Sequence, residues 1–407
     1  MTSSTPTTHP TVHASPEVRD TRVAGAPVAL TTRMSTPPAE SAAADVWATD
    51  LDWLRRAADA ATDHDVDRAL RRPRPGSADL AALLSDAAER RLEELAQRAH
   101  EVTTRRFGRT VHLFAPLYVS NECVSECTYC GFSATNRIVR RTLTIDEVVA
   151  EARSLVDAGH RHLLLVAGEH ARIVSKDYLV DIVAALAPFV PQLSLEVQVW
   201  DIETYRRLVD AGCDGLVVYQ ETYDPSVYDA VHLKGKKRNA AWRMHACDRG
   251  AEAGMRRLGV GALLGLATDW KREVLGVGVH AAALVRRQWR SEVTVALPRM
   301  QPAAGEPEPA LVVDDRSFTQ AIAALRIALP DVGLVLSTRE PPALRDALVR
   351  IGVTHLSAGS HTEPGGYTSA TDAEPQFEIH DTRSPAEVAS MLHSANLDPV
   401  WKDWQRS

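Results

Sequence analysis

The sequence predicts an α/β protein, a TIM-type (β/α)8 barrel that carries a helical extension at its N-terminal side. Beyond residue 111, short apolar runs bounded by glycine or polar residues alternate with longer amphipathic stretches, which is typical of βα units. Eight such runs occur, and several belong to a weak internal repeat. A doubly wound open sheet is the alternative that the same alternation allows.

The eight predicted strands are apolar almost throughout, as expected where both faces of a strand are covered. They lie near residues 111–118, 161–167, 193–199, 214–219, 256–263, 292–297, 333–337 and 353–357. The repeat consists of VDAGHRHLLLV, VDAGCDGLVVY, AEAGMRRLGVG and VRIGVTHLSAG, in which a helix ends at a glycine and a strand follows. We expect Gly159, Gly212, Gly254 and Gly352 to adopt the left-handed conformation that ends helices.

Four segments are expected along the chain. Residues 1–45 are rich in Ser, Thr, Pro and Ala, have no apolar periodicity and no continuous apolar core of a secretory signal, and so predict a disordered tail. Residues 46–108 show helical periodicity and have room for two or three helices. The barrel is expected over 109–383, and a C-terminal helix and tail over 384–407.

Charge and composition exclude several classes of function. The formal net charge is −7, which gives no dense positive charge for nucleic-acid phosphates. No run of about 18 apolar residues occurs that could cross a membrane. The five cysteines are odd in number and three of them are clustered, which favours a metal site over a set of disulfides. Free cysteines also indicate a reducing compartment. These observations predict a cytoplasmic enzyme with a small-molecule substrate.

Three of the cysteines form a compact motif. Cys123, Cys127 and Cys130 lie in CVSECTYC, directly after the apolar run HLFAPLYVS, and so in the loop after the first strand, at the end where barrel enzymes build their sites. Three thiolates can bind three irons of a [4Fe-4S] cluster and leave the fourth iron open. The alternative is a zinc site, whose fourth ligand would have to come from a residue such as His112 or His170.

The other two cysteines, Cys213 and Cys247, stand alone and are expected to be small packing residues. Polar side chains also gather at the C-terminal ends of the predicted strands, where the lumen or rim of the barrel is expected. They are Glu169, Glu196, Gln198, Gln220, Glu221, Ser337 and Arg339. Alternation with a period of two places Glu196 and Gln198 on one face.

The cysteine motif resembles that of the radical S-adenosylmethionine superfamily. Its surroundings resemble the 2-iminoacetate synthase family, the tyrosine lyases of thiazole biosynthesis, from about residue 109 to 404. The resemblance rests on LYVSNECVSECTYCGFSATNRIVRRTL, HLLLVAGEH, VYQETYDPSVYDAVHLKGKK, LSTRE, PGGY and PVWKDW in this order. The loop PRMQPAAGE departs from the more basic version expected in the family, which leaves any role for Gln301 open.

The resemblance implies a [4Fe-4S] cluster and S-adenosyl-L-methionine as cofactors. It also implies cleavage of the Cα–Cβ bond of L-tyrosine to 2-iminoacetate (dehydroglycine) and p-cresol. Thiazole synthase is the implied recipient of the product, because dehydroglycine hydrolyses in water. A flavodoxin or ferredoxin-type protein is the implied electron donor, and the basic run KGKKR, Lys234 to Arg238, is either a solvated loop or a steering surface for it.

Five residues are expected to bind the cofactor. Glu169 matches the position that accepts a hydrogen bond from the cofactor's amino group, and Arg243 the position of its carboxylate partner. Glu196, Gln198 and Gln220 are candidates for the ribose or the substrate. Each has a structural alternative: a helix cap or rim carboxylate for Glu169, a solvated helix arginine for Arg243, and polar layers of the barrel for the other three.

Three residues are expected to contact the substrate. Tyr118 matches a residue that contacts the substrate's amino end in the related tryptophan lyase, and Arg339 together with Ser357 is the expected clamp for the tyrosine carboxylate. A locally satisfied, buried hydroxyl is the alternative for Tyr118, and an ion pair with Glu340 or Asp346 the alternative for Arg339.

Three other functions compete with this one. They are a lyase of tryptophan or another aromatic amino acid, an inactive zinc-binding barrel, and the hydrogenase-maturation tyrosine lyase. The last is disfavoured, because no cysteine follows Cys247 to hold the second cluster of that relative.

Overall fold

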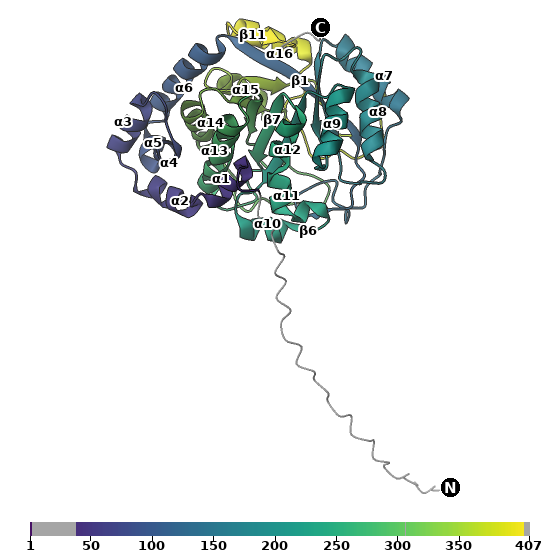
Figure 1. Cartoon of the computed structure of the whole chain (residues 1–407), viewed down its shortest axis with the longest axis horizontal. Helices are drawn as coiled ribbons and strands as arrows, with labels where there is room; N and C mark the ends of the chain where they lie inside the picture. The colour runs from purple at the N-terminus through teal and green to yellow at the C-terminus, as the bar shows by residue number, and fades with distance from the viewer. Residues whose placement is uncertain (2–37, 306, 403–407) are drawn as a thin grey trace. The chain divides into compact units, whose positions relative to one another are not determined.

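Eight parallel strands close into a barrel at the centre of the molecule (Figure 1). The computed structural model describes Met1 and residues 38–305 and 307–402. The barrel strands are β1 (Thr110–Ser120), β3 (His162–Ala167), β4 (Gln192–Glu196), β5 (Gly215–Glu221), β7 (Arg257–Ala262), β8 (Glu292–Ala296), β9 (Gly333–Leu336) and β10 (His355–Ser357). Each pairs in parallel with the next, and β10 pairs with β1, with Leu113 opposite Leu356. The eight predicted strands and the barrel are confirmed, and the open-sheet alternative is excluded.

The strands form where the sequence predicted them because their side chains are buried on both faces. In β3 the five residues from His162 to Val166 are buried, and in β7 all six are. Helices cover the outside of the barrel, so an apolar residue on either face of a strand leaves water. The covering helices are α7 (Ile145–Asp157), α8 (Lys176–Leu186), α9 (Ile202–Ala211), α12 (Ala246–Ala253), α13 (Trp270–Arg287), α14 (Asp315–Ala328) and α15 (Pro342–Leu348).

Three of the four repeat glycines behave as predicted. Gly159, Gly212 and Gly254 have φ values of 109°, 117° and 104°, the left-handed region that glycine enters without steric cost. The prediction for Gly352 is wrong, because its φ is not positive. There the absence of a side chain serves packing: a Cβ would lie 3.1 Å from the Cβ of Arg326, whose guanidinium donates to the Gly352 carbonyl at 2.9 Å.

The N-terminal extension is more finely divided than expected. Within the described residues it has six helices in place of two or three: α1 (Ala42–Ala48), α2 (Leu51–Ala60), α3 (Asp63–Arg71), α4 (Ser77–Leu83), α5 (Asp86–Arg90) and α6 (Leu92–Phe107). Capping side chains explain the breaks, since Asp50 accepts from the amide of Trp53 and Ser85 from that of Ala88. These helices pack on α13 and α14. The first begins inside the stretch expected to be disordered, of which residues 2–37 lie outside the described residues.

The C-terminal segment contains a strand that the sequence analysis missed. After α16 (Pro385–Ser394), strand β11 (Asp398–Val400) pairs in parallel with the first residues of β1, outside the closed barrel. The ring of Trp401 then packs at Gly159 and edge-on against His160. Residues 403–407 lie outside the described part of the chain.

The connection between β5 and β7 adds small elements near the C-terminal ends of the strands. They are α10 (Pro225–Val231), β6 (His232–Lys234), a 3-10 turn (Lys236–Arg238) and α11 (Ala240–Met244). Strand β6 pairs antiparallel with β2 (Glu126–Cys127) of the cysteine loop, with Cys127 opposite His232. In the described residues, every helix is too short or too polar to traverse a lipid bilayer.

Candidate functional site

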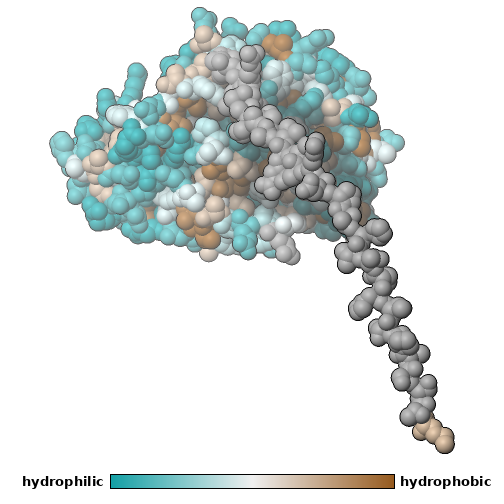
Figure 2. Space-filling view, turned by 90° about the horizontal axis from the view of Figure 1, so that it is seen from below, coloured by the Kyte–Doolittle hydropathy of each residue, from teal (hydrophilic) through white to brown (hydrophobic). Residues whose placement is uncertain are grey.

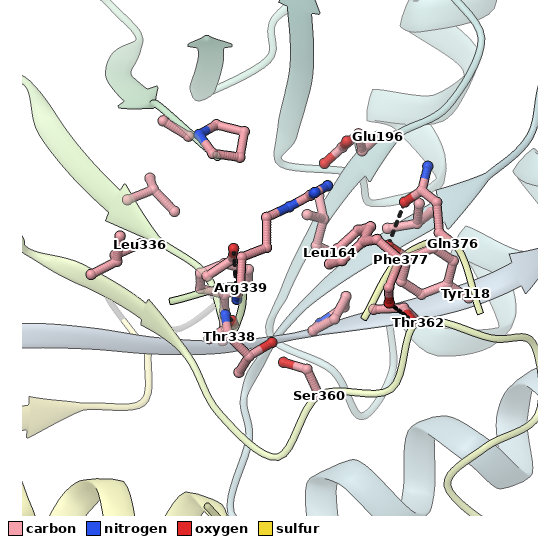
Figure 3. Close-up of a pocket in the computed structure, with 18 of the residues that line it drawn as sticks. Tyr118, Leu164, Glu196, Leu336, Thr338, Arg339, Ser360, Thr362, Gln376 and Phe377 are labelled. Atoms are coloured by element: carbon pink, nitrogen blue, oxygen red, sulfur yellow. Dashed lines mark hydrogen bonds between the residues drawn. The ribbon is translucent and has the colours of Figure 1, made fainter. Parts of the chain in front are cut away.

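Two adjoining hollows open at the C-terminal ends of the barrel strands. The inner hollow, about 690 Å³, lies over the barrel lumen and is drawn in Figure 3. The outer hollow, about 540 Å³, reaches the cysteine loop at Cys130. Glu196, Arg339, Gln376 and Phe377 line both. The site therefore extends from the cysteine loop to the ends of β9 and β10.

The cysteine loop is held in place by the side chain of Arg140 and by close packing at Gly168. Arg140 donates four hydrogen bonds of 2.6–3.2 Å to carbonyl oxygens of the loop and its flanks. Gly168, after β3, lets the loop pass close by, because a Cβ there would overlap the Glu122 carbonyl. Arg140 was not identified from the sequence. Its side chain satisfies backbone carbonyl oxygens of an irregular loop, which in a helix or sheet would be bonded by other backbone groups.

The three thiols of this loop depend on a cationic centre to ionise; Cys127 is buried, and Cys123 and Cys130 are partly buried. Loss of contact with water raises the pKa of all three, and neighbouring thiols add to this effect for Cys123 and Cys127, so that the pKa of Cys127 rises to about 12. The charge of Lys237 acts in the opposite direction on Cys127 and Cys130. Thiolates in such a place require iron or another metal to balance their charge.

The arrangement suits a cluster better than a single zinc ion. Among the described residues, no three His, Cys, Asp or Glu side chains converge so that one metal ion could be held. A cubane cluster binds each cysteine at a different iron, so its ligands need not converge on one point. His112, a proposed fourth zinc ligand, lies near the opposite end of β1 and stacks on His355, with ring centroids 4.7 Å apart. The cysteine set therefore fits a [4Fe-4S] cluster.

Glu169 and Arg243 form a buried ion pair beside the cysteine loop. One oxygen of Glu169 accepts from Arg243 at 3.2 Å, and the other accepts from the Ser125 hydroxyl at 3.1 Å. Arg243 also donates to the carbonyl of Tyr219 at 2.8 Å. Burial would lower the pKa of Arg243, but nearby negative charges, that of Glu169 first, raise it. The alternative of a solvated helix arginine is thereby excluded.

Glu221 extends this charged group from the end of β5. It accepts from Lys237 at 2.7 Å and lies 3.8 Å from Arg243. Burial would raise its pKa, but the charges of Lys237 and Arg243 outweigh burial and lower it. Its φ of 71° costs about 1–3 kcal/mol in a residue that has a side chain. Glu273 of α13 holds the chain there by accepting from the Thr222 hydroxyl and the Tyr223 amide at 2.8 and 2.7 Å.

The far side of the inner hollow holds an arginine that forms no ion pair with any of the described residues. The guanidinium carbon of Arg339 lies 3.3 Å from the centroid of the Phe377 ring. In Figure 3 the side chain reaches over Phe377 toward Glu196. The two carboxylates expected to compete for Arg339 are bound elsewhere, since Glu340 pairs with Arg299 and Asp346 with Arg383.

Three further polar residues of the inner hollow come from β1, β4 and β10. The Tyr118 hydroxyl donates to the side-chain oxygen of Gln376 at 2.7 Å. Burial, and then the charge of Glu221, raise the pKa of Glu196 to about 7. Ser357 lines the hollow, and its hydroxyl oxygen accepts from the Thr338 amide at 3.2 Å.

Two predicted residues do not line either hollow. Strand β4 ends at Glu196, so alternation no longer applies two residues later, and the amide of Gln198 donates to the Val174 carbonyl at 2.9 Å. Gln220 is buried, and neither of its amide atoms has a hydrogen-bond partner among the described residues. Its neighbour Tyr219 points into the hollow. Gln220 therefore points to the opposite face of β5, and the expectation of a shared lumen face fails for both glutamines.

Several residues of the site were missed. Lys237 belongs to a charge run expected to be a solvated loop, yet it is buried beside Glu221 and Tyr129. Gln376 and Phe377 come from the segment after β10, where the one motif noted in the sequence, PGGY, lies at residues 364–367 and does not include them. Only the fold brings them to the cysteine loop, so a single sequence offers no signal for them.

Comparisons with known proteins agree with this geometry. Residues 117–275 match the model of the radical SAM superfamily, and residues 296–398 match that of the biotin and thiamin synthesis associated domain. The chain is 43% identical to a 2-iminoacetate synthase of Escherichia coli over 87% of this chain and 94% of that protein. The corresponding protein of Salmonella typhimurium is 42% identical, with the same coverage. Among solved structures, the [FeFe]-hydrogenase maturase HydG from Carboxydothermus hydrogenoformans superposes with a TM-score of 0.79 at 32% identity, covering 89% of this chain and 84% of that one.

Proposed function

This chain belongs to the 2-iminoacetate synthase family of the radical S-adenosylmethionine superfamily, and from that premise we propose how its residues carry out the reaction. It is a lyase that cleaves the Cα–Cβ bond of L-tyrosine to 2-iminoacetate and p-cresol, and its product serves the thiazole of thiamine. The observation that carries the proposal is the hollow that joins the three-cysteine loop at one end to Arg339 at the other.

Cys123, Cys127 and Cys130 would hold a [4Fe-4S] cluster, with S-adenosyl-L-methionine on its open iron. With the cofactor bound and one electron supplied, the chemistry available at this loop would be hydrogen abstraction by a 5′-deoxyadenosyl radical. Glu169 lies against the loop through Ser125 and can accept from the cofactor's amino group. Arg243, buried next to it, offers a bidentate partner for the cofactor's carboxylate. Glu196, midway along the hollow, is placed for the ribose or the substrate.

Tyrosine would bind in the inner hollow with its carboxylate on Arg339. In the part of the chain that the structure describes, no carboxylate pairs with this guanidinium, and Ser357 lines the same hollow. Tyr118 lies on the side toward the cysteine loop, where the substrate's amino group would meet the cofactor. The floor is apolar, formed in part by Leu164 and Val335, and suits an aromatic ring.

The segment between β10 and α16 would exclude water from the site. It places Gln376 and Phe377 over the hollow, and it is tied to the β9 end because His380 and Asp381 donate their amides to the Thr338 carbonyl at 2.9 and 3.1 Å. Protection matters because 2-iminoacetate hydrolyses in water. Direct transfer to thiazole synthase is therefore the proposed fate of the product.

The electron would enter next to Cys127, where β2 pairs with β6. Leu233 is 53% exposed there, and the exposed Lys234 and Lys236 add positive charge to a protein whose net charge is negative. In Figure 2, which looks onto the side of the molecule where β6 lies in Figure 1, apolar surface is dispersed among hydrophilic residues. An acidic flavodoxin or ferredoxin-type protein would be attracted to this positive surface and is the proposed electron donor. Such donors and reduced cysteine thiols are both found in the cytoplasm, which is the proposed location of this protein.

The test is anoxic incubation of cluster-loaded protein with S-adenosyl-L-methionine, a strong reductant and L-tyrosine. We expect p-cresol and 5′-deoxyadenosine to form together. Replacing tyrosine with tryptophan should give no product from the indole side chain. Deoxyadenosine without p-cresol would retain radical chemistry and remove tyrosine as the substrate.

A further inference from the structure

Gln376 connects the cysteine loop directly to the substrate side of the hollow. Its side-chain oxygen accepts from the Tyr118 hydroxyl at 2.7 Å, and its side-chain nitrogen lies 3.8 Å from the sulfur of Cys130, as a donor. One amide thus bridges a residue proposed to contact tyrosine and a residue proposed to bind iron. The orientation is fixed by chemistry, because a thiolate sulfur can only accept and the amide must therefore turn its N–H groups toward it.

The backbone holds this amide in place. The Gln376 amide donates to the Thr362 carbonyl at 2.9 Å, and the Thr362 hydroxyl donates to the Phe377 carbonyl at 2.9 Å. The segment also presses on the cysteine loop, since a Cβ at Gly131 would overlap the Gln376 carbonyl. Gly131 follows Cys130 directly, so the cysteine and the glutamine are packed as one unit.

The bridge has consequences at both ends. Hydrogen bonds to cysteine sulfur stabilise the reduced form of an iron-sulfur cluster and raise its reduction potential. At the other end, the Tyr118 hydroxyl commits its proton to Gln376. Its oxygen is then left as an acceptor, the role required to receive the ammonium group of tyrosine.

We infer that Gln376 is a positioning residue that couples cluster reduction to tyrosine binding, through the amide bridge from Cys130 to Tyr118. The inference rests on the proposed function. When tyrosine binds at Tyr118, the hydroxyl polarises the amide, and the hydrogen bond to sulfur strengthens. The reduction potential of the cluster therefore rises when tyrosine is bound. By linkage, tyrosine binds more tightly to the reduced protein by the corresponding factor.

The experiment is a redox titration of the full-length, cluster-loaded protein with S-adenosyl-L-methionine, followed by the electron paramagnetic resonance of the reduced cluster, with and without tyrosine. In the wild type we expect tyrosine to shift the potential upward. Gln376→Met, which has no N–H groups, should lower the resting potential and lose the shift. Gln376→Glu retains an acceptor for Tyr118 but has no donor for sulfur, and should give the same two results. Tyr118→Phe should lower the resting potential less than the two Gln376 variants do, because the amide keeps its N–H groups toward the sulfur, and should lose the shift.

Gln97→Met, on the exposed face of α6, is the matched control and should behave as the wild type. The inference is overturned if Gln376→Met and Gln376→Glu both keep the wild-type potential and the response to tyrosine. Should Gln376→Met fold poorly, the glutamate and phenylalanine variants still decide. A wild-type protein that binds no iron would refute the proposed function itself, whereas a loaded wild type without a tyrosine-dependent shift refutes only the coupling.

Discussion

Arg339 lies face-on over Phe377, with 3.3 Å between the guanidinium carbon and the ring centroid, and it has no carboxylate partner among the described residues. Burial lowers the pKa of this arginine, yet guanidinium groups remain charged in proteins. Arg339 is half-buried, packs on a ring and lies toward the more distant Glu196. A cation in such a place is stabilised when a substrate carboxylate enters the hollow.

Arg339→Ala should therefore abolish tight tyrosine binding while leaving the cofactor bound. Removing one partner of a buried, hydrogen-bonded charge pair costs about 2–5 kcal/mol, so we expect KM for tyrosine to rise about thirtyfold or more. Arg339→Lys should recover only part of this, because an ammonium cannot bind a carboxylate in a bidentate manner. Steady-state kinetics with p-cresol detection measures both, and Arg316→Lys at an exposed position is the control. Unchanged kinetics in Arg339→Ala would remove the clamp assignment.

The cysteine assignment predicts opposite outcomes for two buried cysteines. Cys127→Ala should lose the broad absorbance near 400 nm and the bound iron, because a ligand of the cluster is gone. Cys213→Ala should keep both, since the Cys213 thiol lies away from the cysteine loop and donates weak hydrogen bonds to the carbonyls of Leu193 and Gly215, at 3.6 and 3.4 Å. Iron analysis and the absorption spectrum of anoxically prepared protein decide; the reverse pattern means that the ligand set is wrong.

The surface beside Cys127 predicts a charge effect on cluster reduction. Lys234→Glu combined with Lys236→Glu should slow reduction by flavodoxin about tenfold or more at low salt, because steering of an acidic partner is reversed. Reduction by dithionite should not change. The control is Arg71→Glu with Arg90→Glu, which alters the net charge equally at exposed positions of α3 and α5. Equal slowing in both double variants would show a net-charge effect and remove this docking surface.

The eight strands could be predicted because their signals are local. An apolar run such as HLLLV and a glycine such as Gly159 are determined within a few residues, and closure of the barrel then brings the strand ends together. The cysteine motif is equally local. Glu169 and Arg339 could be predicted as site residues because each follows a predicted strand directly. In the structure, Glu169 contacts the cysteine loop and Arg339 lines the inner hollow.

The failures have physical causes of the same kind. Alternation beyond Glu196 assumed that β4 continues, but the strand ends there and Gln198 turns to Val174. A run of charged residues, such as the one around Lys237, predicts an exposed loop, and only the folded structure shows that the Lys237 side chain turns inward to Glu221. Gln376 is separated from Cys130 by 246 residues, and no local pattern connects them.

Glu196 predicts how the stability of the metal-free protein depends on pH. Burial, followed by the charge of Glu221, raises its pKa from 4.5 to about 7 in the folded protein, whereas the unfolded chain retains the ordinary value. Between pH 4.5 and 7 the folded state therefore binds more protons than the unfolded state. The contribution of Glu196 to the free energy of unfolding therefore falls as the pH rises through this window and is lost above pH 7. Buried histidines such as His160 and His355, whose pKa values burial lowers to about 4, contribute with the opposite sign.

Glu196→Gln should remove this contribution, because an amide does not ionise. The full shift corresponds to at most about 3 kcal/mol, and the value in a hydrated hollow is smaller. Urea unfolding at pH 4.5 and pH 7.5 should show that the change in the free energy of unfolding between these pH values is more favourable to the higher pH in the variant than in the wild type, by up to this amount. The contributions of Glu273, whose pKa burial also raises to about 7, and of the buried histidines should be the same in both proteins. If the free energy of unfolding changes equally in the two proteins, Glu196 is not protonated in the folded state, and a bound cofactor would then meet a carboxylate in place of a carboxylic acid.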